Sequence, residues 1–111
     1  MYVEVVPNGL LAGRAAIWIA DRAWSAVAAR GVAHVAVSGG STPAAMFAEL
    51  CVLALPWERV HVWQVDERVA PDGDSNRNAN QLGGFDAAGA VVHLMDVATP
   101  DLAGAAARYA A

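Results

Sequence analysis

The chain has 111 residues, a formal net charge of −4 and a hydrophobic content of 57%. This length fits one domain and is short for a complete α/β enzyme, and the acidic balance offers no basic face to a nucleic acid. All seven basic residues are arginines, which excludes a Schiff-base lysine and the lysine of a nucleotide-binding P-loop.

The single cysteine, Cys51, has no second cysteine with which to form an intramolecular disulfide. We therefore expect neither a disulfide framework nor a thiolate metal cluster, and the reducing cytoplasm is the expected compartment. The apolar stretch near the N-terminus is interrupted by Arg14, Asp21 and Arg22, so we expect no membrane span.

The hydrophobic pattern predicts four strands that alternate with four helices. Strands are expected in four short apolar runs: residues 2–6, 33–37, 60–65 and 90–94. Helices are expected in four longer segments: residues 10–30, 43–55, 76–82 and 101–109. Gly83 and Gly84 are expected to break the third helix. This order predicts an α/β fold with a mostly parallel sheet and helices on both faces.

A glycine-rich turn follows the strand at residues 33–37. Its residues are Ser38, Gly39, Gly40, Ser41 and Thr42. The pattern predicts Thr42 as the N-cap of the next helix and Pro43 as its first residue. Because backbone N–H groups at a helix N-terminus lack intrahelical acceptors and carry the positive end of the dipole, a phosphate fits there. A purely structural turn is the alternative.

Three charged residues, Asp66, Glu67 and Arg68, follow the strand at residues 60–65. In open parallel sheets, ligands bind at the carboxyl ends of the strands. An arginine there can clamp phosphate oxygens, and a carboxylate can hold the arginine or take part in proton transfer. A solvated charge cluster is the alternative.

Asp72, Asp74 and Asn76 have the spacing of the first three ligands of a calcium loop. Arg77 replaces the required glycine and Gly83 the bidentate glutamate, so we expect a turn and no metal site. The histidines are too far apart in sequence for a helical metal-ligand pair, and structural roles are expected for His34, His61 and His93.

Four motifs together resemble the 6-phosphogluconolactonases, and the resemblance covers nearly the whole chain. The motifs are Val37-Ser38-Gly39-Gly40-Ser41-Thr42-Pro43, Pro56-Trp57-Glu58-Arg59-Val60-His61, Asp66-Glu67-Arg68 and Asp74-Ser75-Asn76. The resemblance implies a Rossmann-like three-layer αβα sandwich. It also implies hydrolysis of 6-phosphogluconolactone to 6-phosphogluconate in the pentose phosphate pathway, with no metal or organic cofactor.

The same resemblance assigns the site residues. Asp66 and Arg68 are the catalytic residues that this chain contains. The residues implied in binding the phosphosugar are Ser38, Gly39, Gly40, Ser41, Thr42, Glu67 and Asn76. The expected partner is therefore a small phosphosugar lactone.

The chain lacks the Gly-x-Asp-Gly-His-x-Ala-Ser signature of the family's second half, whose histidine is taken as the general base. Residues 1–111 are thus expected to form a single incomplete domain with little activity of its own, because a positioned base contributes about a hundred- to ten-thousand-fold in rate. The surface left by the missing half is expected to be open to self-association or complementation.

Two other functions stay open. The first is a non-catalytic module that binds sugar phosphates. The second is a deaminase or isomerase of amino sugar phosphates, a related group that shares the glycine turn and the aspartate. That group usually follows its aspartate-glutamate pair with tyrosine, and Arg68 together with Ser75 and Asn76 favours the lactonases.

Overall fold

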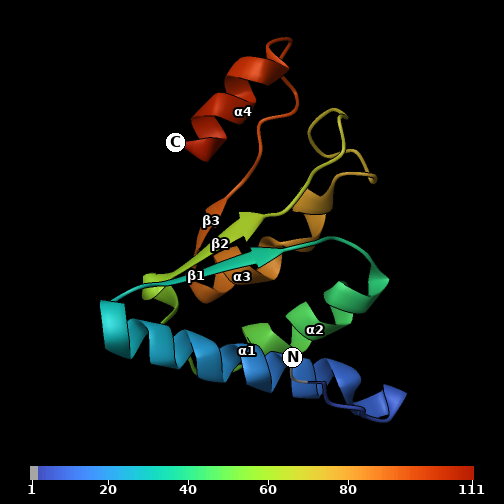
Figure 1. Cartoon of the computed structure of the whole chain (residues 1–111). Helices are drawn as coiled ribbons and strands as arrows, with labels where there is room; N and C mark the ends of the chain where they lie inside the picture. The colour runs from blue at the N-terminus through green and yellow to red at the C-terminus, as the bar shows by residue number, and fades with distance from the viewer. Residues whose placement is uncertain (1–2) are drawn as a thin grey trace.

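The computed structural model describes residues 3–111, which form parallel strands flanked by helices (Figure 1). In chain order the elements are α1 (Asn8–Arg30), β1 (Ala33–Val37), α2 (Ser41–Cys51), the 3-10 helix η1 (Trp57–Arg59), β2 (Val60–Gln64), the 3-10 helix η2 (Asn78–Gln81), α3 (Gly83–Ala88), β3 (Val91–His93) and α4 (Leu102–Ala110). None of the helices within these residues combines the length and hydrophobicity needed to cross a membrane.

The sheet has the order β1-β2-β3, and both strand pairs are parallel. Val35 is paired with Val62, and Val62 with Val92. The α/β fold with a parallel sheet is therefore confirmed, and the sheet is small.

The core lies between one face of this sheet and the helices α1, α2 and α3. Val60 and Val62 alternate on this face and are each 1% exposed, since successive strand residues point to opposite sides. Phe85 of α3 meets Phe47 of α2 edge to face, with ring centroids 5.1 Å apart. Leu50 completes the contact between the two helices and the sheet.

The opposite face carries a row of rings contributed by all three strands. Trp63 stacks on His93 with ring centroids 3.7 Å apart, and His61 Nδ1 lies 2.8 Å from His93 Nε2 in a hydrogen bond. The indole N–H of Trp63 donates to His34 Nδ1 at 3.1 Å. The helix α4 lies on this side of the sheet (Figure 1), where Tyr109 meets the Trp63 ring. Helices flank both faces, and the second face is covered only in part.

The strand predicted over residues 2–6 is wrong for its described part, residues 3–6, which are irregular. Tyr2 lies outside the described residues. Val3 is 70% exposed and Val5 is 92% exposed. The β-branched pattern is present, but no strand within residues 3–111 pairs with this segment, and a strand without a partner leaves its backbone groups unpaired.

The predicted start of the second helix is also wrong. The N-cap is Gly40, and the helix begins at Ser41, so Thr42 is its second residue and Pro43 its third. The φ angle of Gly40 is 123°, a conformation that glycine adopts at no steric cost. Pro43 is tolerated because the first N–H groups of a helix have no intrahelical acceptor.

The third helix differs from the prediction over residues 76–82. The segment forms the short η2, and α3 begins at Gly83, so the expected break at Gly83 and Gly84 is wrong. A Cβ at Gly84 would lie 3.2 Å from Cys51 Sγ. The glycine therefore allows close packing of α3 on α2, which outweighs its poor helix propensity.

Candidate active site

The glycine turn and the loop after β2 meet because their strands are neighbours in register. Val37 and Gln64, the last residues of β1 and β2, are paired, and the Val65 N–H donates to the Val37 carbonyl at 3.0 Å. Ser38 follows Val37 directly, Asp66 is the second residue after Gln64, and both are exposed. The two predicted halves of the site therefore lie side by side at one edge of the sheet.

Glycine is required at two positions of the turn for different reasons. A Cβ at Gly39 would clash with the side chain of Asn78. At Gly40 an added Cβ would meet only Pro43, but the backbone has a positive φ, which favours glycine. The turn is thus shaped by close approach at one residue and by backbone conformation at the next.

The start of α2 offers two backbone N–H groups to an anion, because residues at a helix start have no intrahelical acceptor. Ser41 and Thr42 are its first two residues, so no carbonyl of the helix reaches their N–H groups. The Ala44 N–H donates to the Gly40 carbonyl at 3.1 Å and makes the first bond of the helix. Together with the positive end of the helix dipole and two hydroxyls, this arrangement suits a phosphate group.

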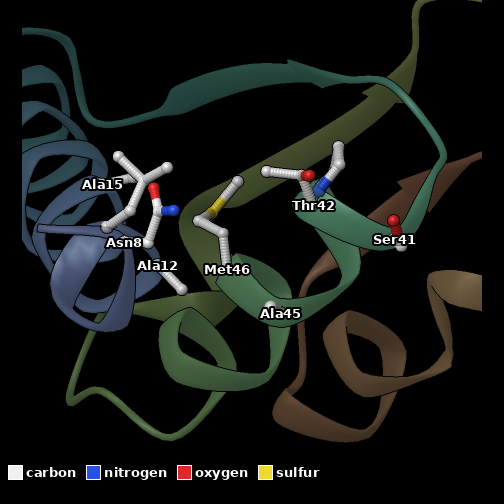
Figure 2. A pocket seen from close by; sticks show the side chains of 9 residues that line it. Asn8, Ala12, Ala15, Ser41, Thr42, Ala45 and Met46 are labelled. Carbon is white, nitrogen blue, oxygen red and sulfur yellow. The ribbon is translucent and has the colours of Figure 1, made fainter.

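An open groove of about 680 Å³ runs from this helix start along α1. Figure 2 shows Ser41 and Thr42 at one end of it and Met46 facing Ala12 and Ala15 of α1. Apart from the residues at the helix start and Asn8, the lining is apolar. The groove borders the start of α2, and its lining offers few partners to hydroxyl groups, whereas the exposed Asp66 at the neighbouring strand end carries a polar side chain.

Glu67 is the anchor of the loop after β2. Its side chain is fully buried, and it accepts hydrogen bonds from Gln64 Nε2 at 2.9 Å and from the N–H groups of Arg68, Asn78 and Ala79 at 2.8, 2.6 and 2.9 Å. Burial raises the pKa of this carboxyl, but the hydrogen bonds outweigh burial and lower the pKa to about 2. Glu67 is therefore placed to hold the loop, and its side chain is buried; the phosphosugar contact that the resemblance implies for it stays a prediction.

Arg77 is the buried counter-ion of Glu67, with a side chain only 5% exposed. Its Nε lies 3.0 Å from Glu67 Oε2 in an ion pair that is not aligned as a hydrogen bond. Its Nη1 donates to Asp72 Oδ1 at 2.7 Å and to the Ala70 carbonyl at 3.2 Å. The hydrogen bond with Asp72, followed by the contact with the Glu67 carboxylate, raises the pKa of Arg77. Asp72 thus closes the loop around Arg77.

Asp66 and Arg68 flank Glu67 and are exposed at the same edge of the sheet as the glycine turn. Asp66 Oδ1 accepts a hydrogen bond from Asn78 Nδ2 at 3.2 Å, and the same amide lies 3.4 Å from the Asp66 carbonyl. Asn78 also lies against Gly39. The carboxylate of Asp66 is thus oriented beside the glycine turn, with the Arg68 cation close to it along the chain.

The predicted residue Asn76 lies in a turn, where its N–H donates to Asp74 Oδ1 at 2.8 Å. Its side chain is exposed, and within the described residues the asparagine against the glycine turn is Asn78. Sequence reasoning missed Asn78 and also Gln81, whose Oε1 accepts the Gly40 N–H at 3.0 Å. Because Asn78 and Gln81 are three residues apart, both lie on one side of a 3-10 helix. This spacing of polar residues is the signal in the sequence that could have identified them.

The family model for glucosamine-6-phosphate isomerases/6-phosphogluconolactonase matches residues 8–111. The 6-phosphogluconolactonase of Mesorhizobium japonicum is 46% identical over 69 residues, which are 62% of this chain and 27% of that protein. The 6-phosphogluconolactonase of Synechocystis is 38% identical over 105 residues, 89% of this chain and 44% of that protein.

Solved structures agree with the sequence comparisons. The crystal structure of a 6-phosphogluconolactonase from Shewanella baltica superposes with a TM-score of 0.85 and 26% identity, over 96% of this chain and 47% of that chain. The chain therefore spans less than half the length of these relatives.

Proposed function

We propose, since the chain belongs to the glucosamine-6-phosphate isomerase/6-phosphogluconolactonase family, that it forms the phosphosugar-binding part of a 6-phosphogluconolactonase. The substrate is 6-phosphogluconolactone, the product is 6-phosphogluconate, and the bond that breaks is the ring ester. The meeting of the glycine turn and the Asp66 loop at neighbouring strand ends is the observation that carries this proposal.

In this proposal the two strand ends divide the substrate between them. The phosphate accepts hydrogen bonds from the N–H groups of Ser41 and Thr42, and its negative charge faces the positive end of the α2 dipole. Asp66 accepts hydrogen bonds from sugar hydroxyls. Arg68 supplies a cation that can bind an anionic group or stabilise a developing oxyanion. Anchoring by the phosphate positions the lactone carbonyl for attack by water.

Neither Glu67 nor any of the three histidines is placed to act as the general base for this attack. Glu67 is buried and has a pKa of about 2. His34 and His61 are the second residues of their strands, far along the sheet from Asp66, and His93 is held by His61 and Trp63. We therefore place the base in a further segment, because the relatives extend well beyond the part that matches this chain.

The same segment is the proposed cover of the partly open sheet face. Residues 1–111 then act as one incomplete domain that is completed by the second part of a lactonase domain. The cytoplasm is the proposed compartment, supported by the single cysteine that has no disulfide partner.

The test of this function is binding, because binding needs no base. Calorimetric titration with 6-phosphogluconate is expected to show saturable binding, and Gly40→Asp is expected to abolish it by adding a charge at the helix start. Ala28→Asp adds the same charge at an exposed position near the C-terminal end of α1. This variant is expected to leave binding unchanged. Equal binding by all three proteins would reject the proposed site.

A second measurement separates this function from its alternatives. Mixing the chain with the unmatched part of the Synechocystis protein is expected to raise lactone hydrolysis about a hundredfold or more above either part alone. Binding without any such gain would favour a non-catalytic module. Turnover of glucosamine 6-phosphate with the lactone untouched would favour a deaminase or isomerase.

A further inference from the structure

The short helix η2 lies between the two strand ends that the proposed function assigns to the substrate. From its first residue, Asn78, a side chain reaches Asp66 and packs against Gly39. From its last residue, Gln81, a side-chain oxygen accepts the N–H of Gly40 at 3.0 Å. One turn of 3-10 helix therefore contacts both the glycine turn, proposed to hold the phosphate, and Asp66, proposed to hold the sugar.

The backbone of η2 is itself fixed from beneath. The N–H groups of Asn78 and Ala79 donate to the buried carboxylate of Glu67 at 2.6 and 2.9 Å. Arg77, directly before η2, is buried and bound to Glu67 and Asp72. Because the Glu67–Arg77 pair is buried and charged, it restricts the backbone from which the side chains of Asn78 and Gln81 extend.

The contact made by Gln81 acts on the start of α2. Gly40 holds a positive φ, a conformation that glycine leaves easily because it has no Cβ. Accepting its N–H fixes this residue, and with it the direction of the N–H groups of Ser41 and Thr42 that follow. Gln81 binds the N–H of Gly40, the residue directly before the helix, and leaves the donors of the first helical residues to an anion.

The contact made by Asn78 acts on the carboxylate. Its amide donates to Asp66 Oδ1, and it lies 3.4 Å from the carbonyl of the same residue. A donor shared between side chain and backbone restricts the rotation of the Asp66 carboxylate, whose second oxygen stays available to a sugar hydroxyl.

We propose that Asn78 and Gln81 are positioning residues of the phosphosugar site, Gln81 for the phosphate and Asn78 for the sugar. This inference rests on the proposed function. It goes beyond that function because it assigns separate ligand groups to two residues that do not themselves hold the phosphate.

The test uses two ligands, inorganic phosphate and 6-phosphogluconate, with calorimetric titration of the whole chain. Gln81→Met keeps the length of the side chain and removes the oxygen, and it is expected to weaken both ligands by the same factor, about fivefold, the equivalent of about one hydrogen bond. Asn78→Ala is expected to weaken 6-phosphogluconate about fivefold and to leave inorganic phosphate unchanged.

Asn80→Ala is the matched control, because Asn80 lies on the same turn and its amide donates to the Asp74 carbonyl instead of contacting the glycine turn or Asp66. It is expected to bind both ligands as the unmodified chain does. A general loosening of η2 predicts instead that all variants weaken both ligands alike, and this outcome would overturn the inference. Unchanged phosphate binding by Gln81→Met would overturn the role of Gln81.

The failure of the proposed function looks different. An unmodified chain that binds neither ligand removes the phosphosugar site and the positioning roles with it. An unmodified chain that binds both ligands, with variants that lack the split between phosphate and sugar, leaves the function standing and rejects the positioning roles alone. The amide resonance of Gly40 gives a direct readout, since it is expected to shift in Gln81→Met and not in Asn80→Ala.

Discussion

The two strand ends of the site are built in opposite ways. The turn after β1 depends on missing side chains, since Gly39 leaves room for Asn78 and Gly40 adopts a positive φ. The loop after β2 depends on one buried carboxylate, Glu67, which binds donors as far along the chain as Ala79. The turn is thus shaped by the absence of side chains and the loop by a buried charge, so they should respond differently to substitution and to pH.

The largest expected effect is the loss of the Glu67 carboxylate. Glu67→Ala leaves the buried Arg77 with the exposed Asp72 as its remaining carboxylate partner and leaves several N–H groups without an acceptor. It is expected to lower the free energy of unfolding by about 3 to 5 kcal/mol. Denaturant titration measures this. Glu58→Ala, at an exposed position of η1, is the control and should change little. A loss below 1 kcal/mol for Glu67→Ala would refute the anchor role.

Acid is expected to weaken the loop through the same group. The pKa of Glu67 is about 2 in the folded chain and ordinarily 4.5, so its contribution to stability is complete above pH 4.5 and is lost as the pH falls toward 2. The loss is about 3 kcal/mol. Denaturant titrations at several pH values should show a shallower decline for Glu67→Gln than for the unmodified chain; parallel declines would contradict this.

The turn is expected to respond to added volume and not to charge loss. Gly39→Ala puts a methyl group into the space of the Asn78 side chain, which is expected to cost about 1 to 3 kcal/mol and to weaken 6-phosphogluconate binding. Gly83→Ala is the matched control because nothing lies within 4 Å of its Cβ. The double variant with Asn78→Ala should regain most of the stability, and no recovery would mean that the strain lies elsewhere.

The smallest effect is expected on the partly open face of the sheet. Burial, and then the charges of His61 and His34, lower the pKa of His93. The folded chain thus favours the neutral ring, and stability should fall modestly as the pH drops below 6.5. His93→Phe is expected to keep the stacking on Trp63 and to reduce this dependence between pH 7 and 5.5. An unchanged dependence would remove His93 as its source.

The difference between turn and loop also explains what the sequence could predict. The strands β1 and β2, the glycine turn and its neighbour Asp66 follow from short-range pattern, and the structure has them together at one edge of the sheet. The sequence did not predict that Glu67 is buried, because this depends on Arg77 and on backbone donors about ten residues further along.

Two other failures have the same physical origin. The start of α2 depends on the φ of Gly40. This angle cannot be inferred from the preference of threonine for N-cap positions or of proline for the first helical position. Asn78 and Gln81 were missed because a 3-10 helix of one turn gives no hydrophobic period, and their contacts are with another strand end.

The hydroxyl of Tyr109 accepts the Gln64 N–H at 2.6 Å and donates to the Gln64 carbonyl at 2.8 Å. These are the two backbone groups through which β2 would recruit another strand just past the end of β3. An unpaired strand edge is a template for aggregation, and a side chain from α4 occupies this one. Growth of the sheet by an added strand, whether from a partner or from misassembly, is thereby blocked at the end of β2 and left to the outer edges of β1 and β3.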